Sequence, residues 1–138
     1  MIIQKEISIT PSSRGFHIIT EAITEVILSS GIMTGTAQVF ILHTSASLTI
    51  NENTDPTVLL DFESYFNHSV PENQDYYLHN YEGADDMPAH IKAMLTAVNL
   101  SIPISKRTLV LGTWQGVFLW EHRRATNQRQ IVLNVVGH

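Results

Sequence analysis

The alternation of apolar and small polar side chains in residues 45–51 most restricts how this chain can fold. A period of two is typical of a β-strand with one buried face. The other face carries hydroxyl and amide groups where a solvated strand usually carries Lys, Glu or Arg, and such short groups suit close approach by a ligand. An ordinary antiparallel strand with a polar outer face is the alternative interpretation. The apolar positions are Ala46, Leu48 and Ile50, and the polar ones are Ser45, Ser47, Thr49 and Asn51.

Polar residues flank this predicted strand at both ends. His43 and Thr44 precede it, directly after an apolar run, and two carboxylates, Glu52 and Asp55, follow it. Asp55 stands immediately before Pro56, which is also the pattern of a helix N-cap with proline in the first turn. The Asp55 carboxylate therefore has two interpretations, a ligand for a substrate or metal and a capping group.

The rest of the chain predicts three helices and several strands arranged in blocks. Because strict βαβ alternation is absent, we expect a single α+β domain over residues 1–138, with antiparallel or mixed sheets. We expect the first helix to include Phe16 and to stop at Gly31, and the third to open at Pro88. The last third of the chain has the pattern of a β-meander. The expected strands are 2–9, 36–42, 101–104, 108–113, 117–122 and 130–136, and the expected helices lie within 16–30, 56–66 and 88–98.

Composition excludes several classes of function. The formal net charge of −5 and the pI near 5.7 argue against a nucleic-acid-binding groove or a polybasic membrane patch. No apolar stretch of about 18 residues predicts a membrane span, and the N-terminal residues lack a signal-peptide pattern. The chain has no cysteine, so disulfides and thiolate metal sites are excluded. We expect a cytoplasmic protein.

The longest predicted loop, residues 72–87, has a composition that suggests a function. Structureless loops of that length are uncommon in small domains unless they bind or gate something. This one holds three tyrosines, His79 and the acidic run from Glu82 to Asp86. His90 follows near a helix N-terminus, where the dipole disfavours the imidazolium and leaves the ring free to bind metal or accept a proton. A histidine at the rim of an apolar stripe, with a single hydrogen bond, is the alternative.

The polar clusters offer ligands for a cation, yet no standard metal motif joins them. Imidazole, carboxylate and amide oxygen suit hard or borderline divalent ions, so we expect Mg²⁺, with Zn²⁺ as the alternative. HExxH and HxH spacings are absent, as are the Walker, GxGxxG and GxSxG patterns of nucleotide-binding and hydrolase folds.

Three segments closely resemble signature blocks of a known family. HTSASLTINEN, EGADDMPAHIK and LGTWQGVFLWE occur in this order, and they resemble the YjbQ-like family, also labelled secondary thiamine-phosphate synthase. The resemblance implies an α+β fold, a homotrimer, and a metal- or anion-binding site near subunit boundaries. It also implies a reaction that joins a hydroxymethylpyrimidine diphosphate to a thiazole phosphate, so the expected substrate is a small phosphorylated heterocycle.

The same resemblance, together with the polar pattern, supplies the candidate site residues. We predict that the five catalytic candidates lie in one polar cleft. Between Gly83 and His90 the sequence departs from the commoner family pattern, so Asp85 and Asp86 are secondary candidates. The catalytic candidates are His43, Asn51, Glu52, His90 and Gln115; the cofactor-binding candidates are Thr44, Ser45 and Lys92; the metal-binding candidates are Glu52, Asp55, Glu82 and His90.

Other reaction classes remain open at this point. Displacing diphosphate requires its charge to be neutralised, normally by Mg²⁺ with Lys or Arg. The chain has only eight such cations; Lys92 lies inside a family block, and Arg123 and Arg124 are further candidates. A metal-dependent hydrolase, in which Glu52 or His90 activates water, and a non-catalytic trimer that binds a small anionic metabolite are the alternatives.

Overall fold

Two antiparallel sheets and three helices make up the chain, which confirms the predicted α+β class. The structure is a computed structural model that describes residues 1–125 and 127–138. The elements are β1 Ile2–Ile9, β2 Gly15–Ile18, α1 Thr20–Ser30, β3 Thr34–Ile41, β4 Ala46–Glu52, α2 Pro56–Ser69, α3 Asp86–Leu95, β5 Asn99–Ser105, β6 Thr108–Leu109, β7 Gln115–Glu121 and β8 Arg129–Gly137.

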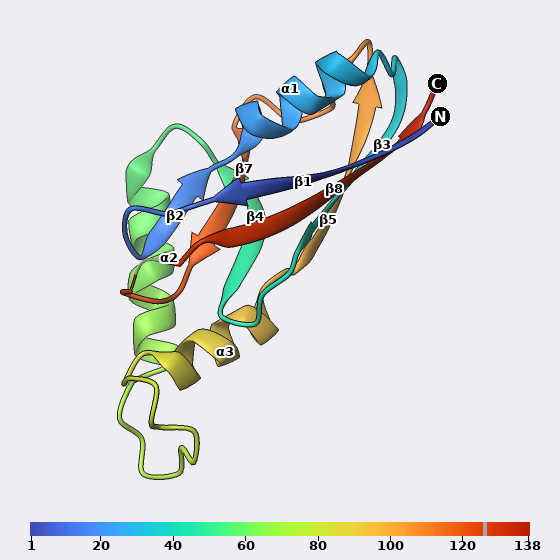
Figure 1. Cartoon of the computed structure of the whole chain (residues 1–138). Helices are drawn as coiled ribbons and strands as arrows, with labels where there is room; N and C mark the ends of the chain where they lie inside the picture. The colour runs from blue at the N-terminus through green and yellow to red at the C-terminus, as the bar shows by residue number, and fades with distance from the viewer. Residues whose placement is uncertain (126) are drawn as a thin grey trace.

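The larger sheet has the strand order β1-β8-β3-β5-β6. The first and last long strands pair along their whole length, from Ile2 opposite Val136 to Ile9 opposite Arg129. The two termini therefore lie side by side at one end of the molecule (Figure 1). β6 pairs with β5 only at Ile104 and Ser105, so the predicted strand 108–113 is shortened to two residues.

The smaller sheet, in the order β2-β7-β4, corrects two predictions. Phe16 was expected on a helix, but it lies on β2 and stacks on Trp120 of β7, with ring centroids 4.3 Å apart. Its spacing to Ile19 and Ile23 fits a helical period, so the pattern alone could not separate the two. The meander is also wrong, because β7 joins β2 and β4 while β8 inserts between β1 and β3.

The hydrophobic core lies between the two sheets and is closed by α1. Ile23 and Ile27 of α1 are at most 1% exposed and pack into this space. Gly31 ends the helix in the left-handed conformation, at φ 74°, as the Ser30-Gly31 pattern predicts. Figure 1 shows α1 running along one edge of the sheets. The core side chains of the sheets include Val39, Ile41, Leu48, Ile102, Ile104, Leu119, Ile131 and Leu133.

The polar face of β4 is interior at Ser47, because α2 covers it, while Thr49 and Asn51 on the same face are half-buried. Phe62 and Phe66 of α2 contact Phe16 and Trp120 of the smaller sheet. Ser47 is fully buried as a result. The interpretation that this face receives a ligand is therefore wrong for Ser47, and its hydroxyl is used inside the protein.

Helix α3 and the loop before it form the end of the molecule opposite the termini (Figure 1). The helix begins at Asp86, two residues before the predicted start at Pro88. This places Asp86 and His90 four residues apart on one helical face. Among the described residues, no helix is long and apolar enough to cross a membrane.

Candidate functional site

Three side chains at the start of α3 bring their ligand atoms together. His79 comes from the loop, and Asp86 and His90 come from the first turns of the helix. Nε2 of His79 lies 2.5 Å from Oδ2 of Asp86, and Nε2 of His90 lies 3.2 Å from the same oxygen. The three ligand atoms all lie within 4.8 Å of one another. We call these residues the His79–Asp86–His90 cluster.

Arg123, which follows β7, fixes the acidic residue of this cluster. Its Nη1 lies 2.5 Å from Oδ1 of Asp86, and its Nη2 donates to the carbonyl oxygen of Glu82 at 2.8 Å. Burial acts to raise the pKa of Asp86, but hydrogen bonds with His79 and Glu82 and the Arg123 charge outweigh it, so that the pKa lies below its usual value. Asp86 is therefore an anion whose Oδ2 faces both imidazoles.

A backbone carbonyl in the loop before β4 orients His90. Nδ1 of His90 lies 2.9 Å from the carbonyl oxygen of Thr44, and a carbonyl oxygen only accepts, so Nδ1 carries a proton. In a neutral ring Nε2 is then a lone pair that faces the Asp86 carboxylate. Two acceptors therefore face each other unless a proton or a cation lies between them. A hydrogen bond from one ring nitrogen to a backbone carbonyl, which leaves the other nitrogen free, is typical of metal-binding histidines.

A mostly apolar pocket adjoins His90 and contains His43. Its volume is about 240 Å³. Nε2 of His43 accepts the backbone N–H of Gln130 at 2.8 Å, which leaves the proton of the neutral ring on Nδ1. Burial and the charge of Arg129 lower the pKa of His43. The lining residues are His43, Thr44, His90, Ala93, Met94 and Val98.

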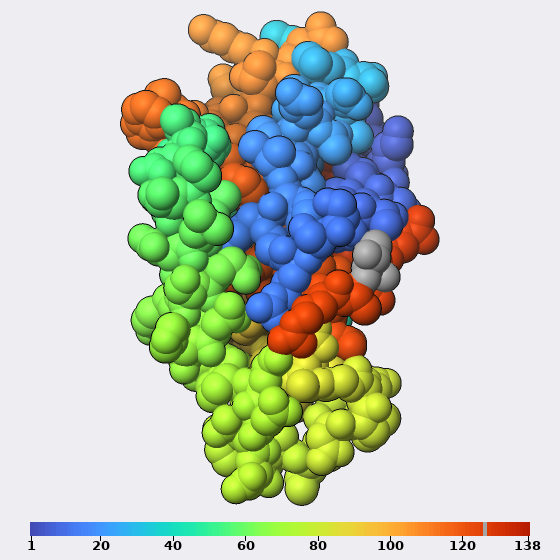
Figure 2. Space-filling model, turned by 90° about the vertical axis from the view of Figure 1, so that its left-hand side faces the viewer, coloured from blue at the N-terminus to red at the C-terminus, as the bar shows by residue number. Residues whose placement is uncertain are grey.

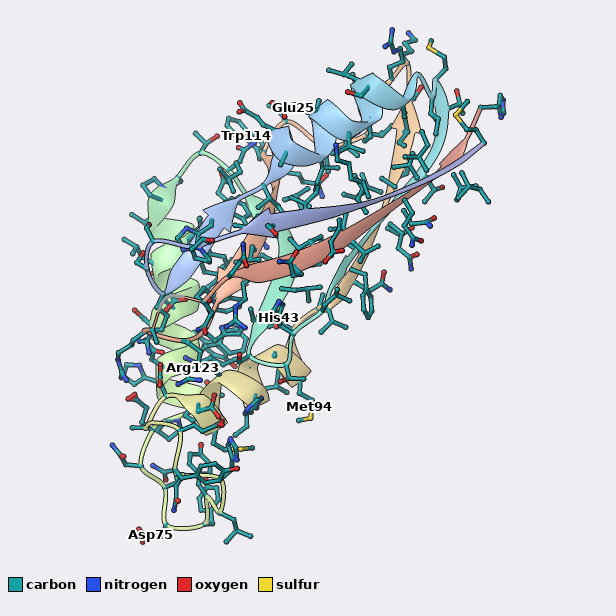
Figure 3. All side chains as sticks on the ribbon, in the orientation of Figure 1. Glu25, His43, Asp75, Met94, Trp114 and Arg123 are labelled. Atoms are coloured by element: carbon teal, nitrogen blue, oxygen red, sulfur yellow. The ribbon has the colours of Figure 1, made fainter. Side chains whose placement is uncertain are left out.

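The remaining catalytic candidates lie at the other end of β4. Asn51 and Glu52 pair with Gly116 and Gln115 on β7, and β4's seven residues put roughly 20 Å between this end and His43. Trp114, the neighbour of Gln115, lies near the start of α1, far from His43 and Arg123 (Figure 3). The prediction of one cleft is therefore wrong within a single chain. The strand's length separates the candidates.

Local hydrogen bonds occupy the polar groups at that far end. Oε2 of Glu52 accepts from the backbone N–H groups of Thr54 and Asp55. Oδ1 of Asp55 accepts from the N–H of Thr57 and caps α2, and hydrogen bonds from Thr57 lower the Asp55 pKa. Oε1 of Gln115 accepts from the N–H of Gly112. These contacts give Glu52 and Asp55 structural roles and place neither of them in the His79–Asp86–His90 cluster.

The other candidates are divided in the same way. Oε2 of Glu82 lies 3.3 Å from Nε2 of His79, so this metal candidate does adjoin the cluster. Ser45 contributes its carbonyl oxygen to Arg129. Lys92 is buried on the side of α3 away from His90, since residues two apart on a helix point in nearly opposite directions, and burial lowers its pKa.

The sequence did not single out His79 as a site residue, offered Arg123 only as a further candidate cation for diphosphate, and ranked Asp86 below its place in the structure. A signal for Asp86 was present, because an Asp and a His four residues apart share a helical face. Placing the helix start at Pro88 hid it. His79 and Arg123 reach the cluster from separate loops, and no spacing pattern marks such a meeting.

Comparisons with known proteins agree with this fold. A family model described as UPF0047 protein YjbQ-like matches residues 5–138. The YjbQ protein of Salmonella typhimurium is 47% identical over 137 residues, covering 97% of each chain, and a UPF0047 protein of Synechocystis is 47% identical over 134 residues, covering 97% of this chain and 91% of its own. A solved structure of an uncharacterised family member from Clostridium acetobutylicum has a TM-score of 0.86 at 34% identity, covering 96% of this chain and 99% of that one.

Proposed function

This chain belongs to the UPF0047 protein YjbQ-like family, and we propose that it is a metal-dependent transferase that forms thiamine phosphate. The metal site is the His79–Asp86–His90 cluster. The substrates are a hydroxymethylpyrimidine diphosphate and a thiazole phosphate, as the sequence resemblance implies.

The hydrogen-bonding environment of His90 is the main support for a metal at this cluster. Both ring nitrogens face oxygen atoms that accept, the Thr44 carbonyl and the Asp86 carboxylate. A neutral imidazole has one N–H and can satisfy only one of them. A divalent cation held by His79, Asp86 and His90 would remove the conflict, because it would accept the lone pair of the His90 ring.

The donor set favours Zn²⁺ over Mg²⁺. Two imidazoles and one carboxylate are typical ligands of zinc and neighbouring transition metals, whereas Mg²⁺ prefers oxygen ligands. Three protein ligands are also the number found in catalytic zinc sites, which keep a position for water or substrate. Glu82, 53% exposed beside His79, is the candidate for a fourth contact.

The surroundings of the cluster suit a phosphorylated heterocycle. When bound, the metal neutralises the negative charge that develops on the departing diphosphate. The pocket beside His90 has apolar walls from Ala93, Met94 and Val98 and polar groups from His43 and Thr44, which fits an aromatic ring with polar substituents. Arg123 holds Asp86 in place through Oδ1 and leaves Oδ2 facing the imidazoles.

The proposed step is a substitution at the pyrimidine methylene carbon. The bond from that carbon to the diphosphate oxygen breaks, and its electron pair leaves with the diphosphate. The lone pair of the thiazole nitrogen forms the new carbon–nitrogen bond. The residues of the pocket orient the ring and exclude water from the reacting carbon.

A metal-dependent hydrolase is the second candidate, favoured by the position of Glu82. Its exposed carboxylate, 3.3 Å from Nε2 of His79, is placed to take a proton from a water molecule at the cluster. Hydrolysis and transfer differ only in whether water or the thiazole nitrogen attacks, so one assay separates them.

The test combines metal analysis with a coupled assay on the full chain. We expect about one Zn²⁺ per chain, and a fall in thiamine phosphate formation of at least about tenfold in His90→Gln and Asp86→Asn, with loss of the metal. His68→Gln, at the exposed end of α2, is the control and should match wild type. Full activity in metal-free protein would overturn the proposal. Release of diphosphate that is independent of the thiazole would favour the hydrolase.

A further inference from the structure

A second polar pocket lies on the opposite side of α3 from the His79–Asp86–His90 cluster. It has a volume of about 240 Å³ and is enclosed by the end of α2, by α3, by the turn before β2 and by the loop after β7. Figure 2 shows this side of the molecule, with the loop after β7 in red above the yellow-green segment. Its polar lining residues are Arg14, Asn67, Glu72, Asp85, Lys92 and Arg124. We call it the Lys92 pocket.

Lys92 is a buried cation with no ionic partner among the described residues. It is 3% exposed, and its one side-chain hydrogen bond goes to Oδ1 of Asn67 at 2.8 Å. An ammonium group has three N–H donors, so two of them lack a partner in the described part of the chain. Burying a charge in this state is costly unless an ion of opposite sign joins it.

Positive charge is concentrated in this pocket. Three of the chain's eight Lys and Arg residues line it, although the net charge of the protein is −5. Arg14 makes no side-chain hydrogen bond or ion pair with a described residue. Arg124 is paired with Glu72. Lys92 and Arg14 therefore form no ion pair with any carboxylate of the described residues, and the Glu63 and Glu72 charges act on Lys92 only from a longer distance.

The two acidic residues of the pocket are already engaged. Glu72 binds Arg124 through both of its oxygens. Asp85 accepts from Nε of Arg123 at 3.3 Å and from the backbone N–H of Arg124 at 2.7 Å. Neither carboxylate is within ion-pair distance of Lys92 or Arg14.

We propose that the Lys92 pocket binds a small phosphate anion, either free or as the phosphoryl group of a metabolite. Lys92 and Arg14 are its ligands, and Asn67 assists. Because Lys92 only donates, the Asn67 atom that receives it must be Oδ1, and this leaves Nδ2 of Asn67 as a further donor. An Arg fork with an ammonium and an amide is a donor set that matches phosphate oxygens.

This site is separate from the metal site, but the two share a hydrogen-bond network through Arg123. The two lie on opposite faces of α3, and Asp85 lines the pocket while it also binds Arg123, whose Nη1 holds Asp86. Phosphate binding does not require a metal, so the two proposals can fail separately. Loss of one leaves the other standing.

The test measures the melting temperature of the metal-free full chain against inorganic phosphate, with sodium chloride at matched ionic strength as reference. Phosphate at about ten times its Kd should raise Tm by about 4 °C. In Arg14→Gln the Kd should rise by at least about tenfold. The control Lys106→Gln, in the exposed turn between β5 and β6, should respond as wild type.

The Lys92→Met variant is a second test of the phosphate site. If Lys92 is held for an anion, this variant should lose the phosphate response and keep or exceed the wild-type Tm in phosphate-free buffer, because an unbalanced buried charge is removed. No response of wild type to phosphate, or an undiminished response in Arg14→Gln, would overturn the proposal. So would a Tm of Lys92→Met well below wild type in phosphate-free buffer, since that marks Lys92 as a structural group.

Discussion

The hydroxyl oxygen of Ser47 on β4 lies 2.9 Å from Nε2 of His122, just after β7, and both residues are at most 1% exposed. The other ring nitrogen, Nδ1, has no hydrogen-bond partner in the described part of the chain. Burial, together with the positive charges of Lys92 and Arg129, lowers the pKa of His122 to about 3. The ring is therefore neutral in the folded protein at any pH near neutrality.

This histidine should make stability depend on pH in a defined direction. Between about pH 3 and 6.5 the unfolded chain binds a proton at His122 and the folded chain does not, so the free energy of unfolding falls as pH falls. The loss from this group between pH 7 and pH 5 should be about 2 kcal/mol. Urea unfolding of wild type and His122→Gln across this range measures it, and the variant should show a flatter profile.

Two histidines outside the core provide the comparison for that experiment. His17 on β2 is half-buried and His68 near the end of α2 is exposed, and among the described residues each hydrogen-bonds to a nearby backbone carbonyl. His68→Gln should therefore retain the wild-type slope. Identical slopes in wild type and His122→Gln would show that His122 is not the group responsible.

The Glu52→Gln variant should decide between the catalytic role that the sequence predicts for Glu52 and the structural role that its contacts indicate. If Glu52 were a catalytic group, the Glu52→Gln variant would lose activity and keep the wild-type Tm. The structure instead has Oε2 accepting two backbone N–H groups at the turn into α2, and charged acceptors form the stronger bonds. We expect Tm to fall by a few degrees while activity per folded molecule is retained. Thermal unfolding and turnover measured on one preparation decide between them.

Much of the fold was predictable because local signals agreed with the tertiary structure. The alternation in β1, Gly31 at the end of α1 and the Asp55-Pro56 start of α2 all form as expected. Strand partners were not predictable, since pairing depends on contacts between distant segments. β7 reads as a neighbour of β6 in the sequence, yet it binds β2 and β4.

The candidate site was predictable only in part, for a similar reason. His90 and Glu82 were named from the sequence, and they do lie at the cluster. Glu52 and Asp55 have the right chemistry as ligands, but their oxygens serve the turn and the cap. Short-range hydrogen bonds of this kind are available to any Asp or Glu near a helix start, so residue type cannot distinguish the two roles.

Arg123 should be essential for the fold of this end of the molecule. It contacts Asp85, Asp86 and the Glu82 carbonyl oxygen, and Asp86 is 3% exposed in its side chain. Removing one partner of a buried ion pair leaves the other charge uncompensated, at a cost of about 3 kcal/mol. Arg123→Gln should lower Tm by roughly 10 °C, as measured by calorimetry. Arg107→Gln, in an exposed turn, should change it little, and an equally small effect for Arg123→Gln would contradict this account.

The outer face of the five-stranded sheet should be buried between copies of the chain. No helix of the described residues covers it, and Glu6 is its one charged side chain among those residues, while Phe40 and Val136 are 42% and 47% exposed. Charge depletion around exposed apolar groups is typical of an oligomer interface. We propose the homotrimer that the family resemblance implies, and light scattering at micromolar concentration should give three times the 15.5 kDa chain mass.

Phe40→Lys should shift the protein toward monomers because it places a buried charge in the interface, whereas Glu21→Lys on the exposed side of α1 should not. A wild-type monomer, or a trimer unaffected by Phe40→Lys, would exclude this face as the interface.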